Sequence, residues 1–338
     1  MHKRILSPGL FLGLVFALTA LVCYWELRCL VKAAPLDSSY LLVLNKAENT
    51  LAIVDPQSYE VLAKVPTGEG PHEVIASADG KLAFVANYGT AQVLGSSLSV
   101  IDLAAKKELR RVDLGALRRP HGIAVANGKV YFTCEVNRVV ARYDPAADKV
   151  DWVMGTGQDA THMLAMSADA KKIYTANIRS NNVTAFDLSA PPLKVVQIPV
   201  GPQPEAIDLS PDGKELWVGQ NADGKISIID TTTNKVRETI QAGRQPIRIK
   251  FTPDGKRALV SDPQTGELIV FEVATRKEIK RIAVGEVPVG ILITPDGKRA
   301  FVATMQAGQV TVVNLEDLSV LKKIEPGKGP DGLAWAGK

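Results

Sequence analysis

A phrase of roughly forty residues recurs along this chain from Tyr40 onward, and its repetition constrains the fold more than any other feature. Residues 204–214 (PEAIDLSPDGK) return as 246–256 (PIRIKFTPDGK) and again as 288–298 (PVGILITPDGK), at steps of 42 residues. The first residue of this phrase, which we call the anchor, occurs seven times, at Pro71, Pro120, Thr161, Pro204, Pro246, Pro288 and Pro330. Such a regular period indicates seven copies of one small structural unit stacked on each other.

Each repeat contains four short apolar runs, and these runs favour strands over helices. They are rich in β-branched and aromatic residues and are separated by Asp-Gly, Asn-Gly or Pro-Asp-Gly, which are typical of tight turns. Four strands at a period near forty residues are typical of a propeller blade. We therefore predict an all-β fold, a seven-bladed β-propeller with four-stranded blades. The acids that end third strands, such as Asp187 and Asp230, should accept hydrogen bonds from backbone amides of the following turn.

The two ends of the repeat region predict how the ring closes. The first repeat begins at its second strand, residues 41–45, and lacks an innermost strand. The last anchor, Pro330, is followed by a single strand that runs to Trp335. We expect this strand to complete blade one, because closure leaves no long unpaired edge of the kind that promotes aggregation.

Three further segments carry a resemblance to a known family. They are residues 70–74 (GPHEV), 79–87 (DGKLAFVAN) and 99–103 (SVIDL). In these segments and in its period the chain resembles the YVTN-type propeller repeat of bacterial and archaeal surface-layer and secreted proteins, from residue 40 onward. The resemblance implies the propeller fold. It leaves activity open, because the family includes both binding proteins and relatives of lactone hydrolases, and a shared fold does not assign a function.

The first 39 residues differ in character from the predicted propeller domain, residues 40–338. A basic start, His2, Lys3 and Arg4, precedes an almost wholly apolar run over residues 5–25. This run is long enough to cross a bilayer as one N-terminal hydrophobic helix. A cleaved signal peptide and a retained signal anchor both fit. In either case we expect the propeller to be extracytoplasmic, periplasmic or at the cell surface, and either anchored in the membrane through this helix or secreted.

Charge and cysteine content narrow the range of partners. The net charge of +4 is small, and Lys and Arg are spread through the turns, so we expect no nucleic-acid partner. Cys134 is the only cysteine of the predicted propeller, which therefore cannot form an internal disulfide. A solitary thiol at the end of a strand is most simply a small buried packing residue.

The positions of the histidines give the main functional prediction. His72, His121 and His162 each follow an anchor directly, and the same position holds Asp331 in blade one and Glu205 in blade five. These five residues should form a polar arc where the innermost strands begin around the central channel. Imidazoles with a nearby carboxylate suit zinc or copper, so we predict a transition-metal site at His72, His121, His162 and Glu205. A metal-free binding or catalytic site, or a structural role inherited by repeat duplication, remains an alternative for these residues.

Loops between second and third strands should open at the same face, which would make a funnel for a small molecule or a partner protein. The ligand-binding residues that we predict there are Asn87, Tyr88, Glu135, Asn177, Arg179, Arg248 and Asp331. Blade two also carries an insertion, residues 88–96, which we expect to form a long flexible loop over the histidines.

Two classes of function are compatible with this pattern. The first is an extracytoplasmic binding or scaffold protein that holds a ligand or metal ion in the funnel. The alternative is a hydrolase or lyase, lactonase-like, that uses the same histidine arc as general base or as metal ligands. The chain has no nucleophile elbow, phosphate loop or two-cysteine metal motif, which places the binding class first.

Overall fold

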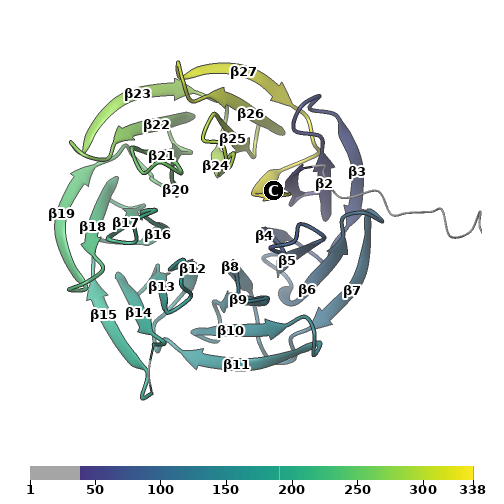
Figure 1. Ribbon diagram of the computed structural model, residues 1–338, viewed down its shortest axis with the longest axis horizontal. Helices are drawn as coiled ribbons and strands as arrows, with labels where there is room; N and C mark the ends of the chain where they lie inside the picture. Colours follow the sequence, from purple (N-terminus) through teal and green to yellow (C-terminus); the bar gives the residue numbers. More distant parts are fainter. Residues whose placement is uncertain (1–38, 190, 338) are drawn as a thin grey trace, which may run out of the picture. The chain divides into compact units, whose positions relative to one another are not determined.

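The computed structural model describes residues 39–189 and 191–337, which form a ring of seven four-stranded antiparallel sheets (Figure 1). This confirms the predicted all-β fold and the number of blades. The predicted N-terminal helix within residues 1–39 lies outside the described residues, apart from Ser39. Within the described part of the chain, no helix has the length and apolar character needed to cross a membrane.

The innermost strands surround the central channel and begin at or near the anchors. They are β28 (Pro330–Ala336), β4 (Pro71–Ala76), β8 (Pro120–Ala126), β12 (Thr161–Met166), β16 (Pro204–Leu209), β20 (Arg248–Phe251) and β24 (Pro288–Ile293), for blades one to seven. The second strands, in the same order, are β1 (Tyr40–Asn45), β5 (Leu82–Gly89), β9 (Lys129–Cys134), β13 (Lys172–Asn177), β17 (Glu215–Gln220), β21 (Arg257–Asp262) and β25 (Arg299–Thr304).

The third and fourth strands complete each blade toward its outer edge. The third strands are β2 (Thr50–Val54), β6 (Leu94–Asp102), β10 (Val139–Asp144), β14 (Asn182–Asp187), β18 (Lys225–Asp230), β22 (Glu267–Glu272) and β26 (Gln309–Asn314). The fourth strands are β3 (Val61–Pro66), β7 (Lys107–Asp113), β11 (Lys149–Gly155), β15 (Lys194–Pro199), β19 (Lys235–Gln241), β23 (Lys277–Ala283) and β27 (Ser319–Ile324).

Blade one is closed by the C-terminal strand, as predicted. Strand β28 pairs antiparallel with β1, and Leu42 lies opposite Ala334. The sheet order β28-β1-β2-β3 therefore joins residues from the two ends of the repeat region. This closure brings Asp331, the second residue of β28, to the central channel beside the start of β4.

The core lies between neighbouring blades. Second strands such as β17 are almost wholly buried, whereas outer strands such as β19 are mostly exposed. The fully buried ring of Trp217 in blade five lies 5.3 Å from that of Phe251 and 6.3 Å from that of Phe271, both in blade six, centroid to centroid. Burial of such large side chains between sheets is the dominant favourable term in holding a propeller together.

The turns follow the chemistry expected from their residues. In the Pro-Asp-Gly turn of blade five, Oδ1 of Asp212 accepts hydrogen bonds from Ser210 Oγ (2.7 Å) and from the backbone N–H of Lys214 (3.1 Å). Gly213 has a φ of 71°, a left-handed conformation that favours glycine. Asp230 accepts from the backbone N–H groups of Thr232 and Thr233, both at 2.9 Å, as predicted for third-strand acids.

The insertion in blade two lengthens a hairpin and does not form the long loop that we expected. Strand β5 extends to Gly89, and strand β6 begins at Leu94. These two residues pair with each other, so the turn between the strands is short. Gly95 lies so close to the backbone of Asn87 and Tyr88 that a Cβ would stand 2.0 Å from the Asn87 carbonyl oxygen. The glycines of the insertion therefore allow close strand pairing at this point.

Candidate functional site

The three histidines that follow anchors meet at the central channel. His72, His121 and His162 are the second residues of β4, β8 and β12, which are neighbouring innermost strands. The ring centroids of His72 and His121 are 4.1 Å apart, and those of His121 and His162 are 3.6 Å apart. The outer two rings, of His72 and His162, are separated by 6.4 Å. The imidazoles thus form one row of three mutually tilted rings, which we call the histidine stack, and they differ in their polar partners.

Close approach of the strand backbones produces this stack. A Cβ on Gly122, the residue after His121, would lie 2.6 Å from the backbone nitrogen of Leu164 and 2.8 Å from the carbonyl oxygen of His162. A Cβ on Gly332 would lie 2.4 Å from the carbonyl oxygen of His72. These distances are too short for any side chain, so glycine at these positions allows β8 to approach β12 and β28 to approach β4.

His121, the central ring of the stack, is fully buried and has no partner for either ring nitrogen among the described residues. Burial, together with the neighbouring positive charges, lowers its pKa well below the usual 6.5. The ring is therefore neutral at physiological pH and keeps a free lone pair. Buried polar groups are nearly always satisfied, so two orphaned nitrogens on one imidazole point to a partner that is not part of the polypeptide.

His72 lies between His121 and an acidic residue of the closing strand. Its Nδ1 lies 3.2 Å from Oδ2 of Asp331 without forming a hydrogen bond to it. Asp331 is almost fully buried and accepts a 3.4 Å hydrogen bond from Lys46 Nζ. Burial lowers the pKa of His72 to about 3, although the Asp331 charge opposes this shift. Burial would raise the pKa of Asp331, but His72 in its protonated form and the standing positive charges of Lys46 and Arg248 outweigh it and lower that pKa.

Glu73 is a carboxylate that lies close to both neutral histidines. One ligand atom each from His72, Glu73 and His121 can be chosen so that all lie within 4.8 Å of one another. Glu73 also forms an ion pair with Arg248, which reaches it across the channel from blade six and is buried. Burial raises the pKa of Glu73, and the guanidinium of Arg248 opposes that rise. Glu73 was not predicted from the sequence, because regular strand alternation would place it on the opposite side from His72.

His162 differs from the other two histidines because both of its nitrogens face carboxylates. Nδ1 is 3.5 Å from Glu135 Oε1, and Nε2 is 3.5 Å from Glu205 Oε1. Burial would lower its pKa, but these two carboxylates outweigh burial and raise it to about 9. The ring is therefore an imidazolium at neutral pH, and His162 with Glu205 forms an ion pair beside the neutral histidines. Asn221 donates a hydrogen bond to the other oxygen of Glu205.

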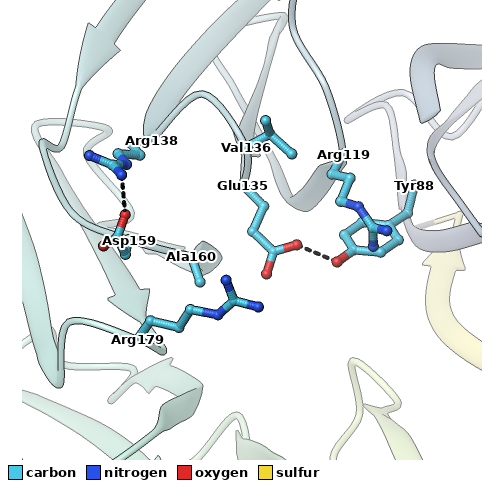
Figure 2. Close-up of a pocket in the computed structure, with 8 residues that line it drawn as sticks. All are labelled: Tyr88, Arg119, Glu135, Val136, Arg138, Asp159, Ala160 and Arg179. Carbon is cyan, nitrogen blue, oxygen red and sulfur yellow. Dashed lines mark hydrogen bonds and ion pairs between the residues drawn. The ribbon is translucent and has the colours of Figure 1, made fainter. Parts of the chain in front are cut away.

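A cavity of about 420 Å³ adjoins the histidine stack (Figure 2). Tyr88 and Glu135 line the cavity, and the Tyr88 hydroxyl donates a hydrogen bond to Glu135 Oε2. The same Tyr88 ring lies 5.4 Å from the ring of His72 and 5.3 Å from that of His121, centroid to centroid. These two side chains therefore form a wall shared by the cavity and the histidines.

The remaining predicted site residues divide between the funnel and the blade interiors. Arg179 lines the cavity, and Arg248 and Asp331 face the histidines. Asn87 and Asn177 are buried within their own blades, where Asn87 donates to Ser97 and Ser99 and Asn177 donates to Asn182 and Thr184. Cys134 is fully buried among apolar side chains, as predicted, and burial raises the pKa of its thiol.

Comparison with known proteins agrees with the repeat family that the sequence resembles. A family described as the YNCE-like β-propeller matches residues 132–252. The chain is 28% identical over 232 residues to Antigen Lp49 of Leptospira interrogans serogroup Icterohaemorrhagiae serovar copenhageni (strain Fiocruz L1-130). This match covers 61% of this chain and 48% of the relative, so the chain spans about half the length of the curated protein that it matches.

Solved structures with the same fold have diverse descriptions. Hydrazine synthase of Kuenenia stuttgartiensis aligns with a TM-score of 0.71 at 19% identity, over 82% of this chain and 93% of that one. A functionally unknown protein from Desulfotomaculum acetoxidans gives 0.75 at 14%, over 88% and 99% of the two chains. A protein from Bacteroides fragilis, provisionally described as a 6-phosphogluconolactonase, gives 0.72 at 16%, over 89% and 99%. At these identities the likeness shows the fold alone.

Proposed function

We propose that this chain, a β-propeller of the forty-residue repeat type, is a binding protein that holds one divalent transition-metal ion, zinc or copper, at the centre of its ring. The observation that carries the proposal is His121, a fully buried neutral imidazole with no partner for either nitrogen in the described part of the chain. A metal ion bound to one nitrogen would supply the missing partner.

The ligands that the geometry favours are His72, His121 and Glu73. Two imidazoles with one carboxylate form a donor set that zinc uses when one position is left for water or another ligand. Both histidines are neutral at physiological pH, so binding a metal there displaces no proton from them. Glu73 has two oxygens and can hold Arg248 with one and a metal ion with the other.

Two residues that contact the proposed metal ligands, Asp331 and Arg248, support the same choice of ligands. Asp331 Oδ2 lies 3.2 Å from Nδ1 of His72 and would help to hold that ring in place beside the ion. Arg248 fixes Glu73 in a comparable way. His162 and Glu205, which the sequence analysis included among the ligands, form an ion pair instead. As an imidazolium, His162 has no lone pair to offer a metal ion.

Metal content tests this proposal directly. Purified protein should carry about one equivalent of zinc or copper by elemental analysis, and chelated protein should rebind one of them in calorimetry. His121→Ala should abolish binding. Asp331→Asn should weaken it by roughly 10- to 100-fold, the usual effect of removing an outer partner of a metal ligand.

Glu73→Gln and Glu205→Gln form a matched pair, because both remove one carboxylate charge next to a histidine of the stack. Glu73→Gln should lose most of the affinity and Glu205→Gln should keep it. Equal affinity in wild type and His121→Ala would remove the metal proposal. Loss in Glu205→Gln with retention in Glu73→Gln would restore the ligand set expected from the sequence.

Hydrolysis or elimination at the same histidines is a second candidate function. The observation that favours it is the shared wall of Tyr88 and Glu135, which places a cavity large enough for a small substrate beside the histidines. Turnover of lactone or ester substrates by metal-loaded protein, lost in His121→Ala, would support this candidate. Absence of turnover across such a panel would leave binding as the function.

An extracytoplasmic location completes the proposal. Its support is the basic start and the apolar run of residues 5–25, which fit either a membrane anchor or a signal peptide. The exported propeller would then meet its small molecule or partner protein outside the cytoplasm. Fractionation of cells that express the full chain should place it in the membrane or outside the cytoplasm, and deletion of residues 5–25 should retain it in the cytoplasm. Cytoplasmic full-length protein would contradict this location.

A further inference from the structure

The cavity beside the histidine stack contains more positive charge than its acids neutralise. Three arginines line it, Arg119, Arg138 and Arg179, together with only two acids, Glu135 and Asp159 (Figure 2). An unmatched positive charge in a partly enclosed cavity attracts anions, because low-dielectric walls concentrate its field. An arginine that has no ion pair within the protein can bind such an anion.

Both acids of the cavity are already paired within the protein. Asp159 Oδ1 lies 2.6 Å from a terminal nitrogen of Arg138, so these two charges neutralise each other. Glu135 accepts a hydrogen bond from the hydroxyl of Tyr88 and lies 3.5 Å from Nδ1 of His162. Among the described residues, neither acid forms a direct ion pair with Arg119 or Arg179, although the charge of Arg119 helps to lower the pKa of Glu135.

Arg119 is held in place but keeps donors available. Its guanidinium carbon lies 4.5 Å from the centroid of the Tyr88 ring, a cation–π contact, and one terminal nitrogen donates to the Thr90 carbonyl oxygen at 3.0 Å. A guanidinium has five N–H donors, so several remain after the bond to Thr90 and the interaction with the Tyr88 side chain. Stacking on the Tyr88 ring orients the guanidinium of Arg119 and leaves N–H donors at its edge for a ligand.

Arg179 has no hydrogen bond or ion pair among residues 39–189 and 191–337. Figure 2 shows its guanidinium extending into the cavity between Ala160 and Glu135, with no dashed line to either. It follows strand β13 of blade four, whereas Arg119 precedes β8 of blade three. The guanidinium groups of Arg119 and Arg179 thus line one cavity from neighbouring blades.

We infer that this cavity binds a small organic anion, whose carboxylate or phosphate group is held by Arg119 and Arg179. The planar fork of a guanidinium matches both groups, and the volume of about 420 Å³ is within the usual range for small-ligand sites. The inference deepens the proposed function, because the ligand would lie against Tyr88 and Glu135 and therefore beside the metal ligands. Anion binding itself depends on the arginines and needs no metal ion.

Calorimetry with two probes, succinate and inorganic phosphate, tests this inference on the whole protein. At least one should bind at micromolar to millimolar concentration, and added salt should weaken it by screening. Arg179→Ala and Arg119→Lys should each lower the affinity by about tenfold or more, since each removes a charge-assisted or bidentate contact. Arg237→Ala is the matched control, because Arg237 is exposed on the outer strand of blade five and should not affect binding.

These measurements can contradict the metal-binding proposal and the anion-binding inference independently. Binding by succinate alone or phosphate alone would each support the inference and identify the anionic group. Binding of neither probe, or equal affinity in Arg179→Ala, Arg119→Lys and Arg237→Ala, would overturn it. His121→Ala, measured alongside, should lose metal and retain the anion; retention of metal with loss of anion binding in Arg179→Ala would show that the two sites act separately.

Discussion

The rings of His121 and His162 stack with centroids 3.6 Å apart and planes inclined by 32°, yet the two carry different charges at neutral pH. The difference comes from their neighbours, since His162 has a carboxylate at each nitrogen and His121 has none. A fixed positive ring therefore lies against a neutral one. The stack can thus offer a lone pair to a metal ion from one ring while the next ring balances two acids.

His162 should make the metal-free protein less stable in alkaline solution. Its pKa is 6.5 in a model compound and is raised to about 9 in the fold, so its stabilising charge is fully present below 6.5 and is lost as pH rises through 9. The loss should be about 3 kcal/mol in the free energy of unfolding. Urea unfolding of chelated protein between neutral and alkaline pH measures it. His162→Gln should lack this part of the pH dependence, and an unchanged alkaline profile in that variant would contradict the assignment.

Replacement of His121 should separate stability from metal binding. In metal-free protein, His121→Leu removes a buried imidazole with two unsatisfied nitrogens, so we expect a gain of about 1–3 kcal/mol in the free energy of unfolding. The same variant should bind no metal. Thermal unfolding with and without zinc measures both effects. If chelated His121→Leu protein were clearly less stable than wild type, the histidine would have a packing role and the metal argument would lose its main support.

Gly122 should be essential for the spacing of the histidine stack. A methyl group there meets the backbone of Leu164 and His162, so Gly122→Ala must move β12 away from β8 or distort them. We expect a loss of about 1–3 kcal/mol, as for other overpacked sites, and weaker metal binding. Gly155→Ala, in the same blade, is the control because nothing lies within 4 Å of its added Cβ. Equal stability and metal affinity in the two variants would show that the close approach is not required.

The fold could be predicted because the repeat period and turn chemistry act locally and agree with each other. Seven anchors, Asp-Gly turns and a lone C-terminal strand after Pro330 are all visible in the sequence, and each has one simple structural meaning. The insertion of blade two was harder to interpret. Gly89 and Gly95 suggested flexibility, whereas their lack of side chains allows two backbones to pair closely.

The site could be predicted only in part, since strand periodicity fails where the inner strands begin. The shared register of His72, His121 and His162 correctly indicated that the imidazoles would meet. Glu73 was missed because alternation would direct it away from His72. A register shift in β4 between Pro71 and Glu73 interrupts that alternation, as a bulge does. Glu73 and Arg248 each stand two residues after the anchor of their own repeat and carry opposite charges. This shared position was the signal in the sequence that could have indicated their ion pair.

Asn87 and Asn177 show a different limit of sequence reasoning. Both end second strands near the funnel, but each amide is buried and hydrogen-bonded to hydroxyl or amide groups of the adjoining third strand. A polar residue at a strand end has the same appearance in sequence whether it faces a cavity or its own sheet. Only the three-dimensional position distinguishes them.

Ring closure also decides when the residues around the proposed metal site come together. His72 and Glu73 lie on the first innermost strand to be synthesised, but the carboxylate beside His72 is that of Asp331 on β28, the last strand of the ring. A chain still emerging from the ribosome or from an export channel has its histidines long before this acid. If the proposed metal site exists, a chain whose β28 has not yet docked against β1 lacks this acid and should hold the ion more weakly than the closed ring.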